Sequence, residues 1–153
     1  MKGRKRHLLV DTLGLVLSVF VSRASLGERE GARVVFRRTL NKWILLLKVF
    51  VDGGYIGTEF GALVQATYGW ILEVVKRNEL HTFKILPKRW IVERTFGWLN
   101  RFRRLSKDYE YYPKTSETVI YWAMIRIMLR RICGRASYCP LGYKRKQFKL
   151  YQL

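Results

Sequence analysis

The amino-acid sequence predicts an α/β domain in which a mixed sheet is flanked by helices. Runs of β-branched and aliphatic residues alternate along the chain with segments of helical periodicity, as is typical of this class. The chain has 153 residues, of which 49% are hydrophobic, enough for one domain with its own core. The longest uncharged apolar stretch, residues 12–22, is shorter than the about 20 residues that cross a bilayer. We therefore expect no membrane partner.

The first half of the chain is expected to hold a hairpin, a helix and a strand. Two aliphatic runs, residues 8–10 and 15–21, are separated by a glycine and predict the hairpin. Residues 32–43 carry apolar side chains at helical spacing among Arg and Lys, which predicts a basic amphipathic helix. Residues 44–51 are apolar on both faces and end at Asp52 and two glycines. They predict a central strand that is covered on both sides.

The second half of the chain is predicted to be mainly helical. Its helical segments are separated by a connection that ends in Pro87 and by a break in the pattern at residues 109–113. The expected elements are a short helix (57–68), a strand (70–75), a connection (78–87), a helix (88–107) and a long helix from a Ser116 cap to about Ile132.

The last 21 residues differ in composition from the rest of the chain, because Gly, Pro and Tyr alternate there with Lys and Arg. Such a segment is typical of a basic tail that folds only on a partner. The sequence therefore predicts a folded domain over residues 1–132 and a tail over residues 133–153. Cys133 and Cys139 lack zinc-ligand spacing to the two histidines, so we interpret them as free thiols.

The charge of the chain indicates a polyanionic partner. Lys and Arg number 30 against 11 Asp and Glu, which gives a formal net charge of +19. A lone compact domain with this charge would repel itself, so nucleic acid is the first expectation. An acidic membrane surface and RNA binding of the ribosomal type are the alternatives. Core-type aromatic residues among the basic ones, including five Trp, argue against both.

Acidic residues are few, so their positions are informative. Asp52 ends the most apolar strand, where α/β sheets present ligands, although a tight Asp-Gly turn explains it equally well. Glu93 is the single acid between Phe83 and Lys107, among eight Lys and Arg. On a helical wheel it lies opposite an apolar face, which suits either a metal ligand or a surface ion pair with Arg89. Mg²⁺ ions held by converging carboxylates act on phosphate esters, and both acids suit that chemistry.

Three motifs in order resemble the DDE transposases of bacterial insertion sequences, in the group with an RNase H-like catalytic domain. They are KGRKRHLLVDTLGL from residue 2, VDGGYIG from residue 51 and LPKRWIVERTFGWLNR from residue 86. The segment RRLSKDYE from residue 103 also fits. The resemblance extends from residue 2 to about residue 132.

The resemblance implies Mg²⁺- or Mn²⁺-dependent cleavage of DNA at transposon ends, followed by strand transfer. The second catalytic Asp of the family matches Asp52 and its catalytic Glu matches Glu93, and both would hold metal. The family's basic position before that Glu matches Arg89. Two positions depart from the signature: Leu86 stands where many members have Tyr, and Asn100 where many have Lys.

One catalytic residue of the family has no match in this sequence. In relatives the first catalytic Asp lies on a strand upstream of residues 2–7, and this sequence begins at that segment. Asp11 matches a different family position, in the hairpin, so we expect a turn role for it rather than metal binding. The expected fold is an RNase H-like mixed sheet without its first central strand, which would leave an apolar edge unpaired.

The expected function is DNA transposition, with this chain a truncated form that is inactive or weakly active alone. The alternative is a non-catalytic DNA-binding fragment that modulates a full-length transposase. The expected partners are double-stranded DNA, at transposon ends and target, and a second copy or a full-length transposase. The expected location is the bacterial cytoplasm, at the nucleoid. The candidate DNA contacts are Lys2, Arg4, Lys5, Arg6, Lys88, Arg89, Arg94, Arg101 and Arg104.

Overall fold

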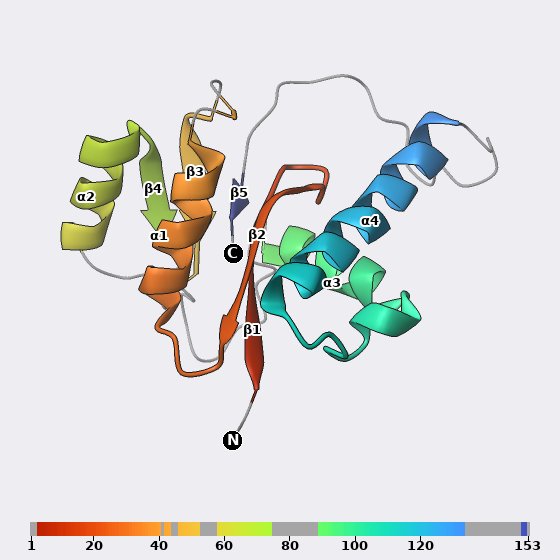
Figure 1. Cartoon of the computed structure of the whole chain (residues 1–153). Coiled ribbons are helices and arrows are strands. Elements are labelled where there is room, and N and C mark those ends of the chain that lie inside the picture. The colour runs from red at the N-terminus through yellow and green to blue at the C-terminus, as the bar shows by residue number, and fades with distance from the viewer. Residues whose placement is uncertain are drawn as a thin grey trace, which may run out of the picture.

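The structure is a computed structural model that describes residues 3–40, 42–43, 46–52, 58–74, 89–133 and 151–152. Within these ranges the chain is a mixed α/β structure, which confirms the predicted class. Helices α1 and α2 lie on one side of the β1–β2 hairpin, and α3 and α4 lie on the other (Figure 1). The elements are β1 (Arg4–Val10), β2 (Val16–Arg23), α1 (Glu28–Thr39), β3 (Lys48–Val51), α2 (Thr58–Tyr68), β4 (Ile71–Val74), α3 (Arg89–Asn100), a 3₁₀ helix (Arg103–Leu105), α4 (Pro113–Ile132) and β5 (Tyr151–Gln152).

The hairpin formed by β1 and β2 confirms the first prediction. The strands pair antiparallel from Arg4 opposite Arg23 to Leu9 opposite Ser18. An irregularity after Leu9 then places Val10 opposite Val16. Because successive side chains of a strand point to opposite faces, the run of aliphatic residues in β1 supplies both sides of the hairpin with apolar surface.

Two apolar clusters cover the two faces of the hairpin. Leu8 and Val10 belong to one cluster, which α3, the 3₁₀ helix and α4 complete. Leu9 belongs to the other, with residues of α1, α2 and β3. Strand β3 is divided in the same way, since Phe50 belongs to the first cluster and Val49 and Val51 to the second. The prediction that this strand is covered on both faces is thus confirmed.

The last two residues of β1 pair on their inner side with the C-terminal strand, where an unpaired edge was expected. Strand β5 runs antiparallel to β1, with Gln152 opposite Leu9 and Tyr151 opposite Val10. It also lies beside β3 (Figure 1). These two residues fall inside the segment that was predicted to be a tail. Tyr151 and Gln152 thus lie between the hairpin and the parallel pair formed by β3 and β4, because they pair with β1 and contact β3.

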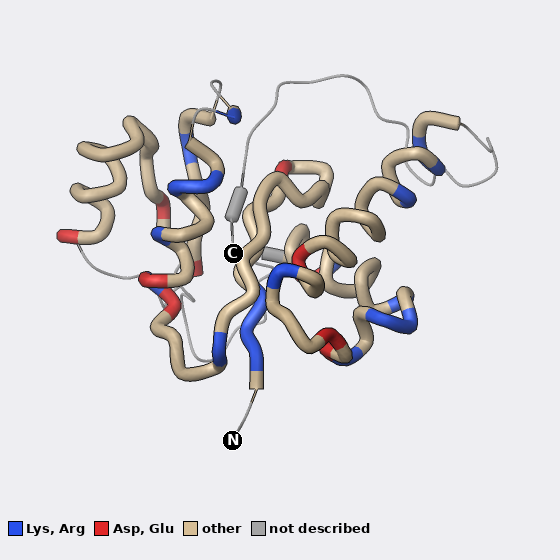
Figure 2. The backbone as a smooth tube through the Cα atoms, viewed as in Figure 1, with Lys and Arg blue, Asp and Glu red and all other residues tan. Residues whose placement is uncertain are grey.

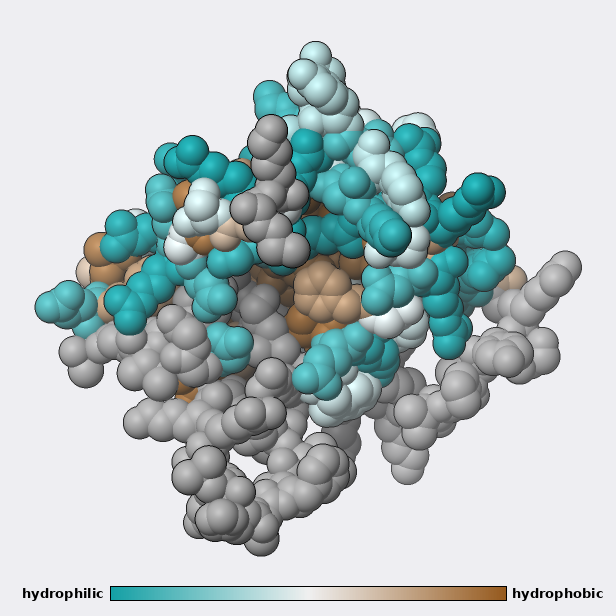
Figure 3. Space-filling view, turned by 90° about the horizontal axis from the view of Figure 1, so that it is seen from below, coloured by the Kyte–Doolittle hydropathy of each residue, from teal (hydrophilic) through white to brown (hydrophobic). Residues whose placement is uncertain are grey.

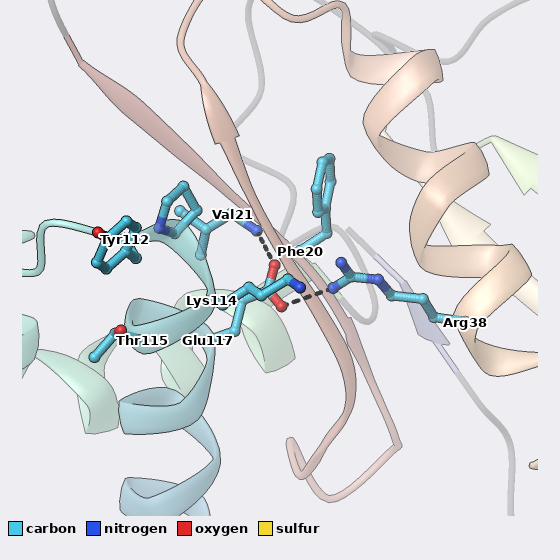
Figure 4. Close-up of a pocket in the computed structure, with 8 residues that line it drawn as sticks. Phe20, Val21, Arg38, Tyr112, Lys114, Thr115 and Glu117 are labelled. Carbon is cyan, nitrogen blue, oxygen red and sulfur yellow. Dashed lines mark hydrogen bonds and ion pairs between the residues drawn. The ribbon is translucent and has the colours of Figure 1, made fainter.

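Side chains from two helices seal the outer edge of β2 (Figure 4). The backbone N–H of Val21 donates to Glu117 Oε1 at 3.0 Å, and that of Val19 donates to Tyr121 Oη at 3.2 Å. Arg38 Nη1 donates to the carbonyl oxygen of Val19 and to Glu117 Oε2, both at 2.8 Å. An exposed strand edge is a template for pairing with other chains, and these side chains satisfy its groups instead.

The helix boundaries differ from the predicted ones for identifiable reasons. Helix α1 occupies residues 28–39 rather than 32–43, and acidic residues in its first turn and Arg37 and Arg38 in its last suit the helix dipole. Helix α3 ends at Asn100 rather than continuing to residue 107, because the chain turns there into the 3₁₀ helix.

Strand β3 and helix α4 also correct the predictions. The strand comprises residues 48–51; of the expected range 44–51, residues 46–47 precede the strand, and residues 44–45 lie outside the described part of the chain. The long helix begins at Pro113, a residue suited to the first helical position because it has no N–H to satisfy. Ser116 is therefore not its cap. Its buried hydroxyl donates to Asp108 Oδ1 at 2.6 Å. None of the described helices combines the length and apolar character needed to cross a membrane.

Gly31 in α1 packs directly against the ring of His7 in β1. A Cβ at position 31 would lie 2.3 Å from His7 Cε1, so Gly31→Ala must push apart two fully packed elements. We expect this substitution to lower the free energy of unfolding by about 1–3 kcal/mol, measured by urea denaturation. Gly61→Ala in α2 is the control, because nothing lies within 4 Å of its Cβ. It should raise stability by about 0.5–1 kcal/mol. Equal effects of the two substitutions would contradict this packing.

Candidate functional site

Asp52 lies at the carboxyl end of β3, as predicted. It directly follows Val51 and is half-buried. Strand β3 pairs in parallel with β4, so the carboxyl ends of both strands meet at one edge of the sheet. The glycine-rich residues that follow Asp52 lie outside the described part of the chain.

Glu93 lies on the exposed side of α3, as the helical wheel predicted. Ile91 on the opposite side is buried, and so is Leu105 in the following 3₁₀ helix. A further contact fixes the helix against the hairpin, because Thr95 Oγ1 donates to the carbonyl oxygen of Gly14 at 2.8 Å. Glu93 is therefore presented to solvent by a helix that is anchored by its other face.

The segments that carry Asp52 and Glu93 reach the same apolar cluster. Phe50 lies two residues before Asp52, and Ile91 and Val92 directly precede Glu93. Within the described residues, however, no three side chains of His, Cys, Asp or Glu gather into a group that would hold a metal ion. The described residues thus offer two candidate oxygen ligands and not the complete set that a catalytic Mg²⁺ site uses.

Asp11 forms the turn of the hairpin. Its Oδ1 accepts the backbone N–H of Leu13 at 2.8 Å and that of Leu15 at 2.7 Å, an arrangement typical of Asp in turns. Gly14 adopts a φ of 78°, in the left-handed region that favours glycine. Burial raises the pKa of Asp11, while the two hydrogen bonds and the nearby Arg131 and Arg94 act in the opposite direction.

Arg94 is packed between aromatic rings on α3. Its guanidinium carbon lies 4.3 Å from the ring centre of Trp90 and 4.8 Å from that of Trp98. The guanidinium also approaches the hairpin, since a Cβ at Gly14 would lie 3.3 Å from Arg94 Nη2. Arg94, a predicted DNA contact, therefore also packs against aromatic side chains of the protein itself.

Arg4 ties the first strand to the loop before α4. Its Nη1 donates to Asp108 Oδ2 at 3.1 Å and to the carbonyl oxygen of Glu110 at 2.7 Å. Its Nη2 donates to the carbonyl oxygen of Tyr111 at 2.5 Å. Burial raises the pKa of Asp108, but hydrogen bonds from Ser116, the Glu110 N–H and Arg4 outweigh it and hold this pKa below its ordinary value.

The neighbouring basic residues of β1 also bond to the protein. Arg6 Nη1 donates to the carbonyl oxygen of Leu105 at 2.8 Å, and Lys5 Nζ donates to that of Leu26 at 3.3 Å. Lys2, Lys88 and the side chain of Arg89 lie outside the described part of the chain. The role of all these residues in DNA binding stays a prediction.

Exposed basic residues gather in the loop after α3 and on α4 (Figure 2). Arg104 is 67% exposed in its side chain and forms an ion pair with Glu110 at 2.5 Å. A shallow cavity of about 320 Å³ opens beside this loop. Figure 3 shows the molecule from below, where hydrophilic residues surround a small apolar patch. The exposed basic residues of this region are Arg101, Arg103, Arg104, Lys107, Lys114, Arg126, Arg130 and Arg131. The cavity is lined by Arg4, Arg6, Phe96, Ser106, Lys107 and Asp108.

Sequence reasoning missed the ion pair between Arg38 and Glu117. The two side chains line a cavity of about 680 Å³ between β2, α1 and α4 (Figure 4). Their positions are 79 residues apart, so no local pattern connects them. Only the folded chain shows that Glu117 accepts a hydrogen bond from the edge of β2.

The pKa of Asp11 leads to a pH-dependent effect on stability. The folded state holds the Asp11 proton more strongly than the unfolded chain, so ionisation of Asp11 costs stability above the raised pKa. Asp11→Asn keeps an acceptor oxygen for the turn and removes that cost. We expect the variant to equal or exceed the wild type in urea denaturation at about pH 7, with an advantage that shrinks towards about pH 4.

Asp11→Ala is the matched control for that measurement. It removes the acceptor of two backbone N–H groups and should lose about 1–3 kcal/mol at either pH. If Asp11→Asn were as unstable as Asp11→Ala at neutral pH, the charge of the carboxylate rather than its acceptor oxygen would hold the turn.

Comparison with known protein families identifies the chain. A family model described as the transposase DDE domain matches residues 1–128, which include the hairpin, Asp52, Glu93 and most of α4. No curated protein and no solved structure matches the chain. Because the family match covers far more than half of the 153 residues, the chain belongs to the transposase DDE domain family.

Proposed function

We propose that the chain is part of the catalytic domain of a bacterial insertion-sequence transposase that acts on double-stranded DNA at transposon ends and target. The family match over residues 1–128 carries this proposal, since the family implies transposition and DNA binding. The net charge of +19 supports it independently, because neutralising phosphates requires many Lys and Arg. The pairing of β5 with β1 and its contact with β3 are compatible with an RNase H-like mixed sheet.

Asp52 and Glu93 are the proposed metal ligands. Asp52 follows the carboxyl end of a parallel strand, Glu93 is exposed on an anchored helix, and the residues just before each of them share one cluster. Transposases of this family typically use divalent metal ions, and Mg²⁺ or Mn²⁺ bound by carboxylates would supply an activated nucleophile at phosphorus. The chain's own contribution is to hold these two carboxylates on rigid elements.

The isolated chain is proposed to be inactive or weakly active. Metal sites for this chemistry normally use three carboxylates. Asp11, the other aspartate of the N-terminal half, accepts two backbone N–H groups of the hairpin turn with its Oδ1. A carboxylate from outside the described residues is therefore required to complete the set.

A second candidate function is non-catalytic DNA binding that modulates a full-length transposase, by competing for DNA ends or pairing with its subunits. The observation that favours it is the distribution of charge. The exposed basic residues after α3 and on α4 do not depend on a complete metal site (Figure 2). The two functions differ in one measurable respect, which is whether DNA binding is accompanied by metal-dependent cleavage.

DNA binding should depend steeply on salt and on the loop after α3. Arg101 and Arg103 are exposed there, so Arg101→Gln with Arg103→Gln should weaken binding to a DNA duplex. We expect the slope of log K against log salt to fall by about one for each lost phosphate contact, measured by fluorescence anisotropy. Arg37→Gln on the exposed side of α1 is the control. A slope unchanged in the double variant would exclude this loop from the interface.

Metal binding should depend on Asp52 and Glu93 and not on Asp11. We expect Asp52→Asn and Glu93→Gln each to weaken Mn²⁺ binding at least about tenfold in calorimetric titration, since each removes a charged oxygen ligand. Asp11→Asn and Glu59→Gln, which alter acids outside the proposed site, should bind Mn²⁺ like the wild type.

The same proteins test the activity of the chain. Purified wild-type protein with Mg²⁺ or Mn²⁺ should not cleave a duplex that carries the ends of its own element. Cleavage that is lost in Asp11→Asn would overturn the proposed inactivity and assign Asp11 to the metal site. Metal binding that survives both Asp52→Asn and Glu93→Gln would remove these residues from the site.

A further inference from the structure

Two adjacent tyrosines are exposed in the loop before α4, beside the cavity of about 680 Å³. The side chain of Tyr111 is 83% exposed and that of Tyr112 is 65% exposed. We propose that these two residues, which we call the tyrosine pair, bind unpaired bases of single-stranded DNA by stacking. The assignment rests on the proposed action on DNA and deepens it, because it names unpaired bases as a second DNA structure that the chain binds.

The arrangement of the tyrosine pair leaves ring faces open for stacking. Burial stabilises the large apolar ring of a tyrosine, so two neighbouring exposed rings indicate a surface that contacts a ligand. The ring centres lie 4.8 Å apart and the ring planes are nearly perpendicular, at 89°. The edge of one ring thus meets the face of the other, and each ring keeps a face that its neighbour does not cover. Every nucleobase has a π-face that stacks on such a ring.

The backbone that carries the tyrosine pair is held by hydrogen bonds from other elements. Arg4 of β1 donates to the carbonyl oxygen of Glu110 at 2.7 Å and to that of Tyr111 at 2.5 Å. Asp108 Oδ1 accepts the hydroxyl of Ser116 in α4 at 2.6 Å. A loop that is already ordered loses little conformational entropy when a ligand binds, and this favours binding.

The cavity beside the tyrosine pair is of a size that accepts a base. Its volume of about 680 Å³ lies in the range of about 300–1,000 Å³ found for sites that bind small organic ligands. Tyr112 lines it together with Phe20 of β2, which supplies a second aromatic ring (Figure 4). The acid in its lining, Glu117, forms an ion pair with Arg38 at 2.8 Å. A base that stacks on Tyr112 therefore meets further aromatic surface, and the charge of Glu117 is neutralised.

The charge around the tyrosine pair favours nucleic acid over a protein as the ligand. Residues 101–114 contain five Lys and Arg against two acids, and the acids form ion pairs with Arg4 and Arg104. Lys107 and Lys114 are exposed before and after the pair in the sequence. Exposed cations attract phosphates, and aromatic rings among cations are the combination by which proteins hold single strands.

The ring faces distinguish a single strand from a duplex. In a duplex each base is stacked between its neighbours, so a protein contacts the phosphates and the base edges in the grooves. The exposed arginines of the loop after α3 need only phosphates, whereas the tyrosine pair needs bases whose faces are free. The pair should therefore add affinity for single-stranded DNA and leave the affinity for a duplex unchanged.

The test compares the binding of three labelled DNA probes by the full chain, measured by fluorescence anisotropy. The first is a single strand of about twelve thymidine nucleotides, which spans a site of this kind. The second has the same sugar-phosphate backbone with abasic positions in place of the bases, so its charge matches the first. The third is a blunt-ended duplex. We expect the wild type to bind the thymidine strand at least about tenfold more tightly than the abasic strand, because stacking of the bases is lost in the latter.

Three variants assign this difference to the tyrosine pair. Tyr111→Leu with Tyr112→Leu keeps apolar side chains but removes the ring faces, so it should lose most of the preference for the thymidine strand. Tyr111→Phe with Tyr112→Phe keeps the rings and should bind like the wild type. Trp122→Ala removes an aromatic residue of α4 that is 69% exposed, and as the matched control it should also bind like the wild type. Binding of the duplex should be unchanged in all three variants.

Equal binding of the thymidine and abasic strands by the wild type would overturn the proposal, and this comparison needs no variant. A preference that survives the double Leu variant, or that is lost equally in Trp122→Ala, would place the stacking site elsewhere. A preference lost in the Phe variant would mean that the hydroxyl groups and not the ring faces bind DNA. The circular dichroism of each variant identifies folded protein, and Tyr111→Leu alone decides the matter if the double Leu variant does not fold.

The three probes also separate this proposal from the proposed function. A wild-type protein that binds none of them would contradict both. Salt-dependent binding of the duplex without a preference for the thymidine strand over the abasic strand would contradict stacking by the tyrosine pair alone. Binding of the thymidine strand without binding of the duplex would support the tyrosine pair and contradict the proposed action on double-stranded DNA.

Discussion

The β1–β2 hairpin is apolar on both faces, and the rest of the structure depends on the need to cover it. Leu8 and Val10 require one set of helices and Leu9 requires another, so the elements divide into two clusters around the hairpin. The same constraint explains how its edges are treated. The outer edge of β2 is closed by side chains from α1 and α4, whereas the inner edge of β1 receives a strand from the other end of the chain.

Scarce acidic residues serve structural purposes in this strongly basic chain. Asp108 and Glu110 hold Arg4 and Arg104 at the loop before α4, and Glu117 holds Arg38 at the strand edge. Asp11 closes the hairpin turn. These interactions neutralise a small part of the positive charge and leave a large exposed excess near the α3–α4 side (Figure 2). A surface of this kind suits binding to phosphates, in agreement with membership of a transposase family.

Local patterns predicted the existence of most elements better than their boundaries. The hairpin, α2, β4 and α4 overlap closely the segments that apolar periodicity indicated. Helix α1 was displaced by one turn because its start is marked by acidic residues rather than by apolar ones. Ser116 was read as a cap although tertiary structure uses its hydroxyl to bind Asp108. Hydrogen bonds between distant segments produce no periodic pattern in the sequence. The errors in the predicted boundaries therefore occur at the ends of helices and strands.

Four properties can be read from the amino-acid sequence: the family, the α/β class, the excess of positive charge, and the positions of Asp52 at a strand end and Glu93 on a helix. These properties follow from composition, short motifs and periodicity, which are local. Three features depend on the folded chain: Arg94 packs against two Trp rings, Arg38 and Glu117 bond at the edge of β2, and β5 pairs with β1 beside β3. The second and third of these contacts join residues that are distant in the sequence. Those residues meet because both apolar faces of the β1–β2 hairpin have to be buried, which brings the distant segments together.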